Sequence, residues 1–166
     1  MTARFRAMDR VRRSEWLFWT FVIMIVALTA STIILERGYI WPLVDPGDAL
    51  LYVGASMMTV GYAIRRLAIY ILGNAFSNIL KIKQGQTLIR SGIYGRVRHP
   101  AYTGTLILVA GIPLLFSSPI GLIPVSLAIP AVLYRIMVEE RMLTERFGDE
   151  YTEYVKCTKM LVPYVF

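Results

Sequence analysis

The sequence predicts an all-α integral membrane protein with about four transmembrane helices, the last two forming a C-terminal helical hairpin. Hydrophobic residues make up 56% of the 166 residues, and the mean hydropathy is +0.55. Several uncharged runs are long enough to cross a hydrocarbon core of roughly 30 Å. The net charge of +7 lies in blocks between these runs and not on one amphipathic face. This pattern indicates membrane orientation and argues against a nucleic-acid partner.

The first predicted helix covers residues 16–35, which carry no charge and follow an arginine-rich segment. This run is longer than the roughly 7 to 15 apolar residues of a signal peptide, and no small-x-small cleavage site follows it. We therefore expect it to remain as a membrane helix. Residues 36–48 contain two glycines and two prolines, which predict a loop.

The second predicted helix begins near Ala49, meets the Arg65-Arg66 pair and ends before Gly73-Asn74. Long arginine side chains can extend from an apolar helix to the membrane interface, so this pair indicates the inner end of the helix. The segment that follows is too polar to span a membrane. It is expected to be a cytosolic connection.

The predicted hairpin lies in residues 100–134, a run of 35 residues without a charge. This run is longer than a single membrane helix requires. Ser117-Ser118-Pro119 near its middle predicts the turn between two helices. The second of these helices continues in polar character and is expected to stop at Gly148.

The distribution of basic residues predicts the orientation. Seventeen of the eighteen lysines and arginines fall on one side of this topology, and Arg37 is the exception. Both termini are therefore expected in the cytosol. Cys157 is the single cysteine, so an internal disulfide is excluded. We expect one membrane-embedded domain over residues 1–166, in which 1–60 supply the N-terminal helix, the outer loop and the start of helix two, and 61–166 form the core.

Polar side chains gather at the predicted start of the third helix. Pro100 suits the first turn of a helix, so the helix is expected to start at His99 or Pro100 with unpaired backbone N–H groups that attract an anion. Arg98 adds a positive charge, and the His99 and Tyr102 side chains can form hydrogen bonds. The alternative is that Arg98 marks the interface, His99 caps the helix and Tyr102 belongs to an aromatic belt.

A second polar group follows at the same predicted membrane depth. Arg135 and Glu139 are four residues apart and therefore share one face of a helix. An ordinary ion pair on an amphipathic surface helix is the alternative interpretation. The hairpin places this pair close to the start of the third helix.

Together these residues resemble the isoprenylcysteine carboxyl methyltransferase family and its relatives among the phospholipid methyltransferases. The resemblance covers about residues 61–166 and includes an ordered set of motifs. These are Gly73-Asn74-x-Phe76-Ser77, Thr87-Leu88-Ile89-x-Ser91-Gly92-Ile93-Tyr94, Arg98-His99-Pro100-x-Tyr102-x-Gly104, Glu139-Glu140-x-x-Leu143-x-x-x-Phe147-Gly148-x-x-Tyr151-x-x-Tyr154 and Lys159-x-Leu161-x-Pro163.

The resemblance implies transfer of a methyl group from S-adenosyl-L-methionine to a lipid or to a prenylated small molecule or peptide, without a metal. It implies cytosolic cofactor-binding segments in place of a Rossmann domain. Arg135 and Glu139 would be the catalytic residues, and Arg135 would bind the acceptor. By the same resemblance, the cofactor-binding residues would be Lys81, Gln86, Thr87, Leu88, Ile89, Tyr94, His99, Pro100, Ala101, Tyr102 and Glu139.

Two enzyme reactions remain open on the sequence alone. Carboxyl O-methylation is favoured because an arginine such as Arg135 can bind a carboxylate through two parallel hydrogen bonds. N-methylation of an amino phospholipid would need Glu140 or His99 as a base. A non-catalytic lipid-binding protein and a transporter are minor alternatives, and the predicted spans lack the acid that a small exporter needs. The active site is expected in the cytosol, and a prokaryotic inner membrane is favoured over the endoplasmic reticulum.

Overall fold

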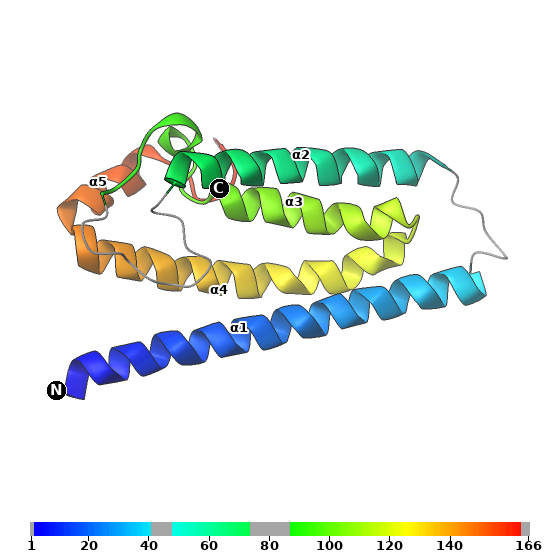
Figure 1. Ribbon diagram of the computed structural model, residues 1–166, viewed down its shortest axis with the longest axis horizontal. Coiled ribbons are helices and arrows are strands. Elements are labelled where there is room, and N and C mark those ends of the chain that lie inside the picture. The colour runs from blue at the N-terminus through cyan, green and yellow to red at the C-terminus, as the bar shows by residue number, and fades with distance from the viewer. Residues whose placement is uncertain (1, 41–47, 74–86, 164–166) are drawn as a thin grey trace.

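The computed structural model describes residues 2–40, 48–73 and 87–163, and this part of the chain is almost wholly helical (Figure 1). It confirms the all-α class, since the described residues hold only an isolated parallel bridge, Val97 to Lys159, and no strand. The helices are α1 Thr2–Leu35, α2 Asp48–Leu72, α3 Pro100–Leu115, α4 Leu122–Phe147 and α5 Asp149–Cys157. Shorter elements are the π-helix η1 Glu36–Ile40 and the 3₁₀ turns η3 Gly92–Gly95 and η4 Pro119–Gly121.

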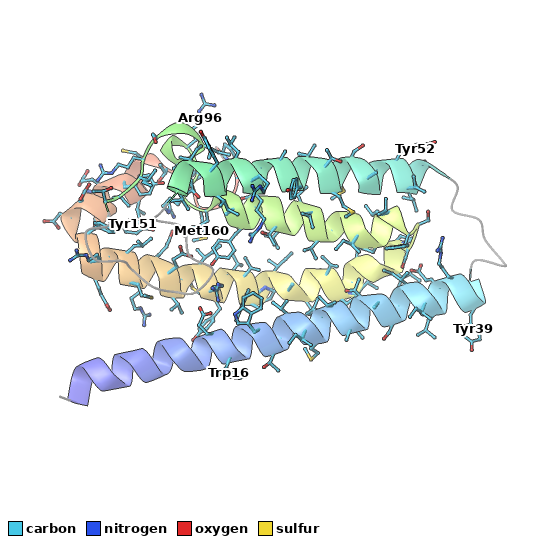
Figure 2. All side chains as sticks on the ribbon, viewed as in Figure 1. Trp16, Tyr39, Tyr52, Arg96, Tyr151 and Met160 are labelled. Atoms are coloured by element: carbon cyan, nitrogen blue, oxygen red, sulfur yellow. The ribbon has the colours of Figure 1, made fainter. Side chains whose placement is uncertain are left out.

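Four long helices lie side by side, and α5 folds back at one end (Figure 1). Two of them contain stretches long and apolar enough to cross a membrane, Phe18–Tyr39 and Pro119–Phe147, whereas α3 is apolar but shorter. Large aromatic side chains point away from the bundle along α1 and η1, where Trp16 is 72% and Tyr39 75% exposed (Figure 2). Such exposed apolar surface fits contact with lipid better than contact with water.

α1 begins earlier than expected and ends at Leu35, as predicted. The helix extends through the arginine-rich segment to Thr2, and η1 continues it into the region expected to be a loop. The carboxylate of Glu36 is buried and accepts a hydrogen bond from the Ser118 hydroxyl. This bond ties η1 to the connection between α3 and α4, which explains why the loop does not begin at residue 36. Residues 41–47 lie outside the described part.

The two helices α2 and α3 pack through facing glycines. A Cβ atom on Gly61 would lie 2.5 Å from the Leu108 backbone nitrogen, and one on Gly104 would lie 2.7 Å from the Arg65 nitrogen. Gly54 and Gly111 repeat the arrangement farther along, because a Cβ atom on either would lie within 2.8 Å of the backbone of the facing helix. Close backbone approach through small residues is a typical packing mode of membrane helices. It fixes the start of α3 against α2.

The predicted ends of the later helices agree with the structure. α3 begins at Pro100, and Ser117 and Ser118 lie between α3 and α4, where the chain turns back (Figure 1). α4 ends at Phe147 and is capped by Gly148, the predicted stop, which adopts a positive φ of 54°. Glycine adopts this backbone conformation without the steric cost that a side chain brings.

Candidate active site

The segment that leads into α3 is held by the C-terminal segment of the chain. The Arg98 backbone nitrogen donates to the Lys159 carbonyl at 2.8 Å, and the His99 nitrogen donates to the Met160 carbonyl at 3.0 Å. In return, the Lys159 nitrogen donates to the Arg96 carbonyl at 3.0 Å. His99 occupies the N-cap position of α3, as the alternative interpretation expected, but its side chain makes no capping hydrogen bond. Residues far apart in sequence thus fix the start of α3.

Glu140 connects α4 to this segment. Its Oε1 atom accepts a hydrogen bond from Arg98 Nε at 2.7 Å and lies 3.2 Å from His99 Nε2. Arg98 also donates through Nη1 to the carbonyls of Thr158, at 2.6 Å, and Val155, at 3.3 Å. The positive charge that Arg98 was expected to offer to an anion is therefore paired with Glu140. Through these bonds Arg98 and Glu140 hold α4 and the C-terminal segment against the start of α3.

Tyr102 connects the two predicted halves of the site. Arg135 Nε donates to the Tyr102 hydroxyl at 2.9 Å, and this hydroxyl donates to Glu139 Oε2 at 3.0 Å. The structure thus brings together three of the predicted residues, from α3 and α4. Arg135 and Glu139 do not form the direct i, i+4 ion pair that was the alternative interpretation, because the phenol of Tyr102 stands between them.

Two residues of α1 also contact Arg135, and sequence analysis did not find them. Arg135 Nη1 forms an ion pair with Glu15 Oε1 at 2.9 Å, and the side chains are 6% and 11% exposed. The Arg135 Cζ atom lies 4.4 Å from the centre of the Phe18 ring. Glu15 stands directly before the uncharged run, with Phe18 three residues later on the same helical face. That spacing was the available signal.

Two buried tyrosines support η3 beside this cluster. The Tyr154 hydroxyl donates to the Tyr94 carbonyl at 2.7 Å, and the Tyr94 hydroxyl donates to the Ala68 carbonyl at 3.4 Å. Burial raises the pKa of Tyr154 to about 12, although nearby Arg98 lowers it in part. Burial, followed by the charge of Glu139, also raises the pKa of Tyr94. Both phenols therefore stay protonated at neutral pH and act as donors.

Only some of the other predicted cofactor-binding residues lie at the start of α3. Pro100 and Ala101 form its first turn, and Thr87, Leu88 and Ile89 lie in irregular chain before η3. This chain is anchored by Arg90, whose Nη2 lies 2.9 Å from Glu150 Oε1. Lys81 and Gln86 lie outside the described residues. Within the described ranges, no group of three or more His, Cys, Asp or Glu side chains could hold a metal ion.

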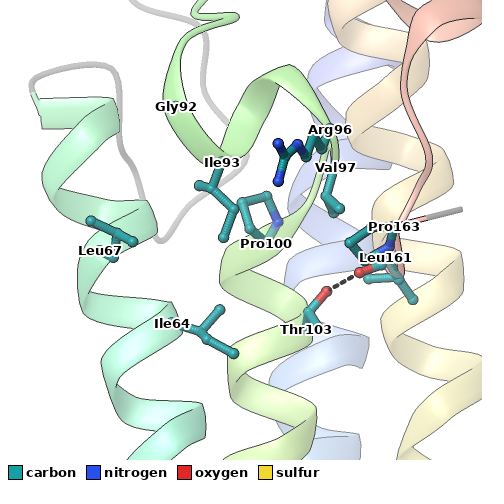
Figure 3. Close-up of a pocket in the computed structure, with 10 residues that line it drawn as sticks. All are labelled: Ile64, Leu67, Gly92, Ile93, Arg96, Val97, Pro100, Thr103, Leu161 and Pro163. Atoms are coloured by element: carbon teal, nitrogen blue, oxygen red, sulfur yellow. Dashed lines mark hydrogen bonds between the residues drawn. The ribbon is translucent and has the colours of Figure 1, made fainter.

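An open cavity of about 610 Å³ lies on the α2 side of the start of α3 (Figure 3). Its walls are mainly apolar, and Arg96 and Thr103 are the polar exceptions among its side chains. The Thr103 hydroxyl donates to the Leu161 carbonyl at 2.7 Å. Pro100 belongs both to this cavity and to the predicted cofactor site. The volume is within the range of small-molecule sites, roughly 300–1,000 Å³. The lining residues are Ile64, Leu67, Gly92, Ile93, Arg96, Val97, Pro100, Thr103, Leu161 and Pro163.

Known proteins resemble this chain in sequence. The isoprenylcysteine carboxyl methyltransferase (ICMT) family model matches residues 54–145. A probable protein-S-isoprenylcysteine O-methyltransferase of Oryza sativa is 32% identical over 117 residues, which are 69% of this chain and 61% of that protein. The Saccharomyces cerevisiae protein-S-isoprenylcysteine O-methyltransferase is 31% identical over 116 residues, 68% of this chain and 48% of the yeast protein. The chain thus spans about three-fifths or less of the length of these relatives.

A solved structure supports the same relationship at the level of the fold. The eukaryotic intramembrane Ras methyltransferase ICMT superposes with a TM-score of 0.75 over 87% of this chain and 52% of that chain. At 21% identity, this likeness shows the fold alone. The family match, in contrast, establishes family membership, because it covers more than half of the sequence. The matched residues include the facing glycines and the Tyr102 to Glu139 contact. The chain belongs to the isoprenylcysteine carboxyl methyltransferase family.

Proposed function

We propose that this protein is an S-adenosylmethionine-dependent integral membrane methyltransferase that methylates a carboxyl group on a lipophilic acceptor of the isoprenylcysteine type. The observation that carries the proposal is the hydrogen-bonded series from Arg135 through Tyr102 to Glu139. It places a buried cation beside a carboxylate at the start of α3. The names of the relatives, protein-S-isoprenylcysteine O-methyltransferases, support the reaction class.

The residues around Glu139 suit the proposed cofactor. When bound, S-adenosylmethionine supplies an electrophilic methyl group. Glu139 is partly exposed and can pair with the ammonium of an amino-acid moiety. Tyr151 is 1% exposed, and its hydroxyl has no hydrogen-bond partner among the described residues. Buried hydroxyls are normally hydrogen-bonded, and a polar ligand group would satisfy this one. In this proposal Glu139 and the first turn of α3 hold the cofactor.

Arg135 would bind the acceptor in this reaction. A carboxylic acid is ionised at neutral pH, so it is already a nucleophile and needs no base. Arginine can align such a group through two parallel hydrogen bonds. The site then contributes by orienting donor and acceptor and by excluding water. This role agrees with the near-complete burial of the Arg135 side chain.

N-methylation of an amino phospholipid is less well supported. An ammonium acceptor has to lose a proton before it can attack, and the candidate bases are Glu140 and His99. Their side chains contact each other at 3.2 Å, and Glu140 also pairs with Arg98. Arg135 could bind the phosphate of such a lipid. Arg135 could therefore bind the acceptor in either reaction, and the methylated product distinguishes the two.

We also propose four membrane crossings, α1 to α4, with both termini and the site in the cytosol of a prokaryotic cell. The location of seventeen of the eighteen basic residues supports this orientation.

A methyl-transfer assay tests the proposed function. The purified protein receives cofactor labelled in the methyl group together with a prenylated cysteine derivative or with an amino phospholipid. We expect label in the first acceptor, released as methanol by mild base. Base-stable label in the phospholipid head group would contradict carboxyl O-methylation and show N-methylation instead. If calorimetry in detergent detects no binding of S-adenosylmethionine or of its demethylated product, the methyltransferase proposal fails.

A further inference from the structure

The proposed acceptor-binding arginine is already paired with another element of the chain. Arg135 Nη1 lies 2.9 Å from Glu15 Oε1, and the Phe18 ring covers the guanidinium at 4.4 Å. Both partners belong to α1, which contacts α4 more than any other described element. They also lie outside the family match over residues 54–145. The contact is therefore a feature of this chain that the family relationship does not assign.

The geometry of the guanidinium limits how an acceptor can bind. A carboxylate that binds through two parallel hydrogen bonds uses either Nε with one terminal nitrogen or the two terminal nitrogens. Nε donates a hydrogen bond to the Tyr102 hydroxyl at 2.9 Å. The Glu15 carboxylate lies 2.9 Å from Nη1 as an ion-pair partner, although this contact lacks hydrogen-bond geometry. Each of the two arrangements thus contains an atom that is already engaged. An acceptor carboxylate must displace Tyr102 or Glu15.

Charge decides between the two. Tyr102 is a neutral hydroxyl that is itself bound to Glu139, and its contact does not repel an incoming anion. Glu15 is an acid of the same kind as the acceptor group. Two carboxylates at one buried guanidinium repel each other, whereas a buried guanidinium with no counterion is strongly unfavourable. The favourable process is an exchange, in which one carboxylate leaves as the other arrives.

We infer that Glu15 occupies the subsite on Arg135 that the anionic group of the acceptor takes, and that Glu15 leaves this subsite when the acceptor binds. The inference rests on the proposed function for its acceptor. It makes Glu15 a residue that sets acceptor affinity, because the ion pair keeps most molecules closed to the acceptor. Molecules in which Glu15 has left Arg135 are open to the acceptor. The apparent dissociation constant is the intrinsic one divided by the fraction of open molecules, so a small open fraction weakens the apparent affinity.

Steady-state kinetics of Glu15→Gln test this role. Glutamine keeps the size of the side chain but not its charge, so the open fraction rises. We expect the KM for the carboxylate acceptor to fall roughly tenfold while kcat changes by less than about twofold, as expected if about one molecule in ten is open in the wild type. Glu15→Asp, which restores the charge, should return KM toward the wild-type value. Glu153→Gln, which changes an exposed acid of α5, is the matched control.

An unchanged or higher KM in Glu15→Gln, with a lower kcat, would overturn the inference. That outcome would show that Glu15 only supports the fold around Arg135 or helps to bind the acceptor.

A binding experiment without catalysis keeps the inference separate from the proposed function. Glu15→Ala removes the carboxylate that pairs with Nη1 of Arg135, so an external acetate ion should take its place. We expect sodium acetate to raise the thermal unfolding temperature of Glu15→Ala more than sodium chloride at the same concentration. The wild type should show no difference between the salts.

If acetate and chloride act alike on Glu15→Ala, the inference fails even where methyl transfer has been demonstrated. If acetate stabilises the variant but no methyl transfer is found, the proposed function fails and the subsite on Arg135 stands. Should Glu15→Ala not fold, the acetate comparison is made on Glu15→Ser, whose hydroxyl leaves space beside Arg135 and tolerates burial. The same two outcomes then decide.

Discussion

At the scale of single residues, the site contains two carboxylates with different surroundings. Glu140 is paired with Arg98 and His99 and holds α4 against the segment before α3. Glu139, the preceding residue, contacts Tyr102 and remains partly exposed. Neighbouring acids in the sequence thus divide into one that fixes the structure and one that is available to a ligand.

Substitutions of Glu139 and Arg135 separate cofactor from acceptor binding. Glu139→Gln removes the charge that would pair with the cofactor ammonium, so we expect cofactor binding to weaken by roughly 10- to 150-fold, the usual effect of a charged hydrogen bond. Arg135→Lys keeps the charge beside Glu15 but cannot form two parallel hydrogen bonds. It should leave cofactor affinity unchanged and lower kcat/KM at least about tenfold. Calorimetry and methyl-transfer rates measure the two effects.

Arg141→Ala, an exposed position of α4, is the control for both variants. The reverse pattern, in which Arg135→Lys loses cofactor and Glu139→Gln does not, would exchange the proposed roles.

Tyr102→Phe tests the bridge between α3 and α4. Phenylalanine keeps the ring but removes the hydroxyl that orients Arg135 and Glu139. Loss of both hydrogen bonds to these positioned groups should lower kcat by roughly tenfold with little change in unfolding temperature. Tyr134→Phe changes an exposed tyrosine of α4 and should have wild-type activity. Full activity of Tyr102→Phe would remove this residue from the site.

At the scale of elements, sequence periodicity and turn residues predicted most helix ends but not the contacts between helices. Pro100 predicted the start of α3, because proline lacks the N–H that a helix interior requires. Gly148 predicted the end of α4, because glycine readily adopts a positive φ. The facing glycines of α2 and α3 were not predicted, since one sequence does not show which helix a small residue faces. The Glu15 to Arg135 contact was missed for the same reason, and because Glu15 stood just outside the apolar run.

Gly104→Ala should destabilise the α2–α3 pair. The added methyl would meet the Arg65 nitrogen and the Gly61 carbonyl, both at 2.7 Å, and the backbones would have to separate. Overpacking of this kind costs about 1–3 kcal/mol. We expect a lower thermal unfolding temperature in detergent and weaker cofactor binding, since α3 carries the site. Gly38→Ala is the control because no atom lies within 4 Å of its added Cβ. Equal stability of the two variants would contradict this packing.

At the scale of the whole molecule, the proposed membrane orientation rests on the distribution of basic residues and can be tested at a single thiol. Cys157 is the single cysteine and is exposed in α5. With the site in the cytosol, a membrane-impermeant maleimide should label it in inverted vesicles and not in intact cells. Cys157→Ser provides the unlabelled control. Labelling in intact cells would show that the orientation is the opposite of the proposed one. The proposed orientation rests on the count of basic residues and not on a contact in the structure.

The bonds from the C-terminal segment have a consequence for biosynthesis. The carbonyls of Thr158, Lys159 and Met160 bind the backbone or side chains of Arg98 and His99, so the segment before α3 lacks its partners until those late residues have been made. During translation, α1 to α4 can enter the membrane while the site is still incomplete. The proposed methyl transfer can therefore begin only after residues 158–160 have been made and their segment has folded back onto the start of α3.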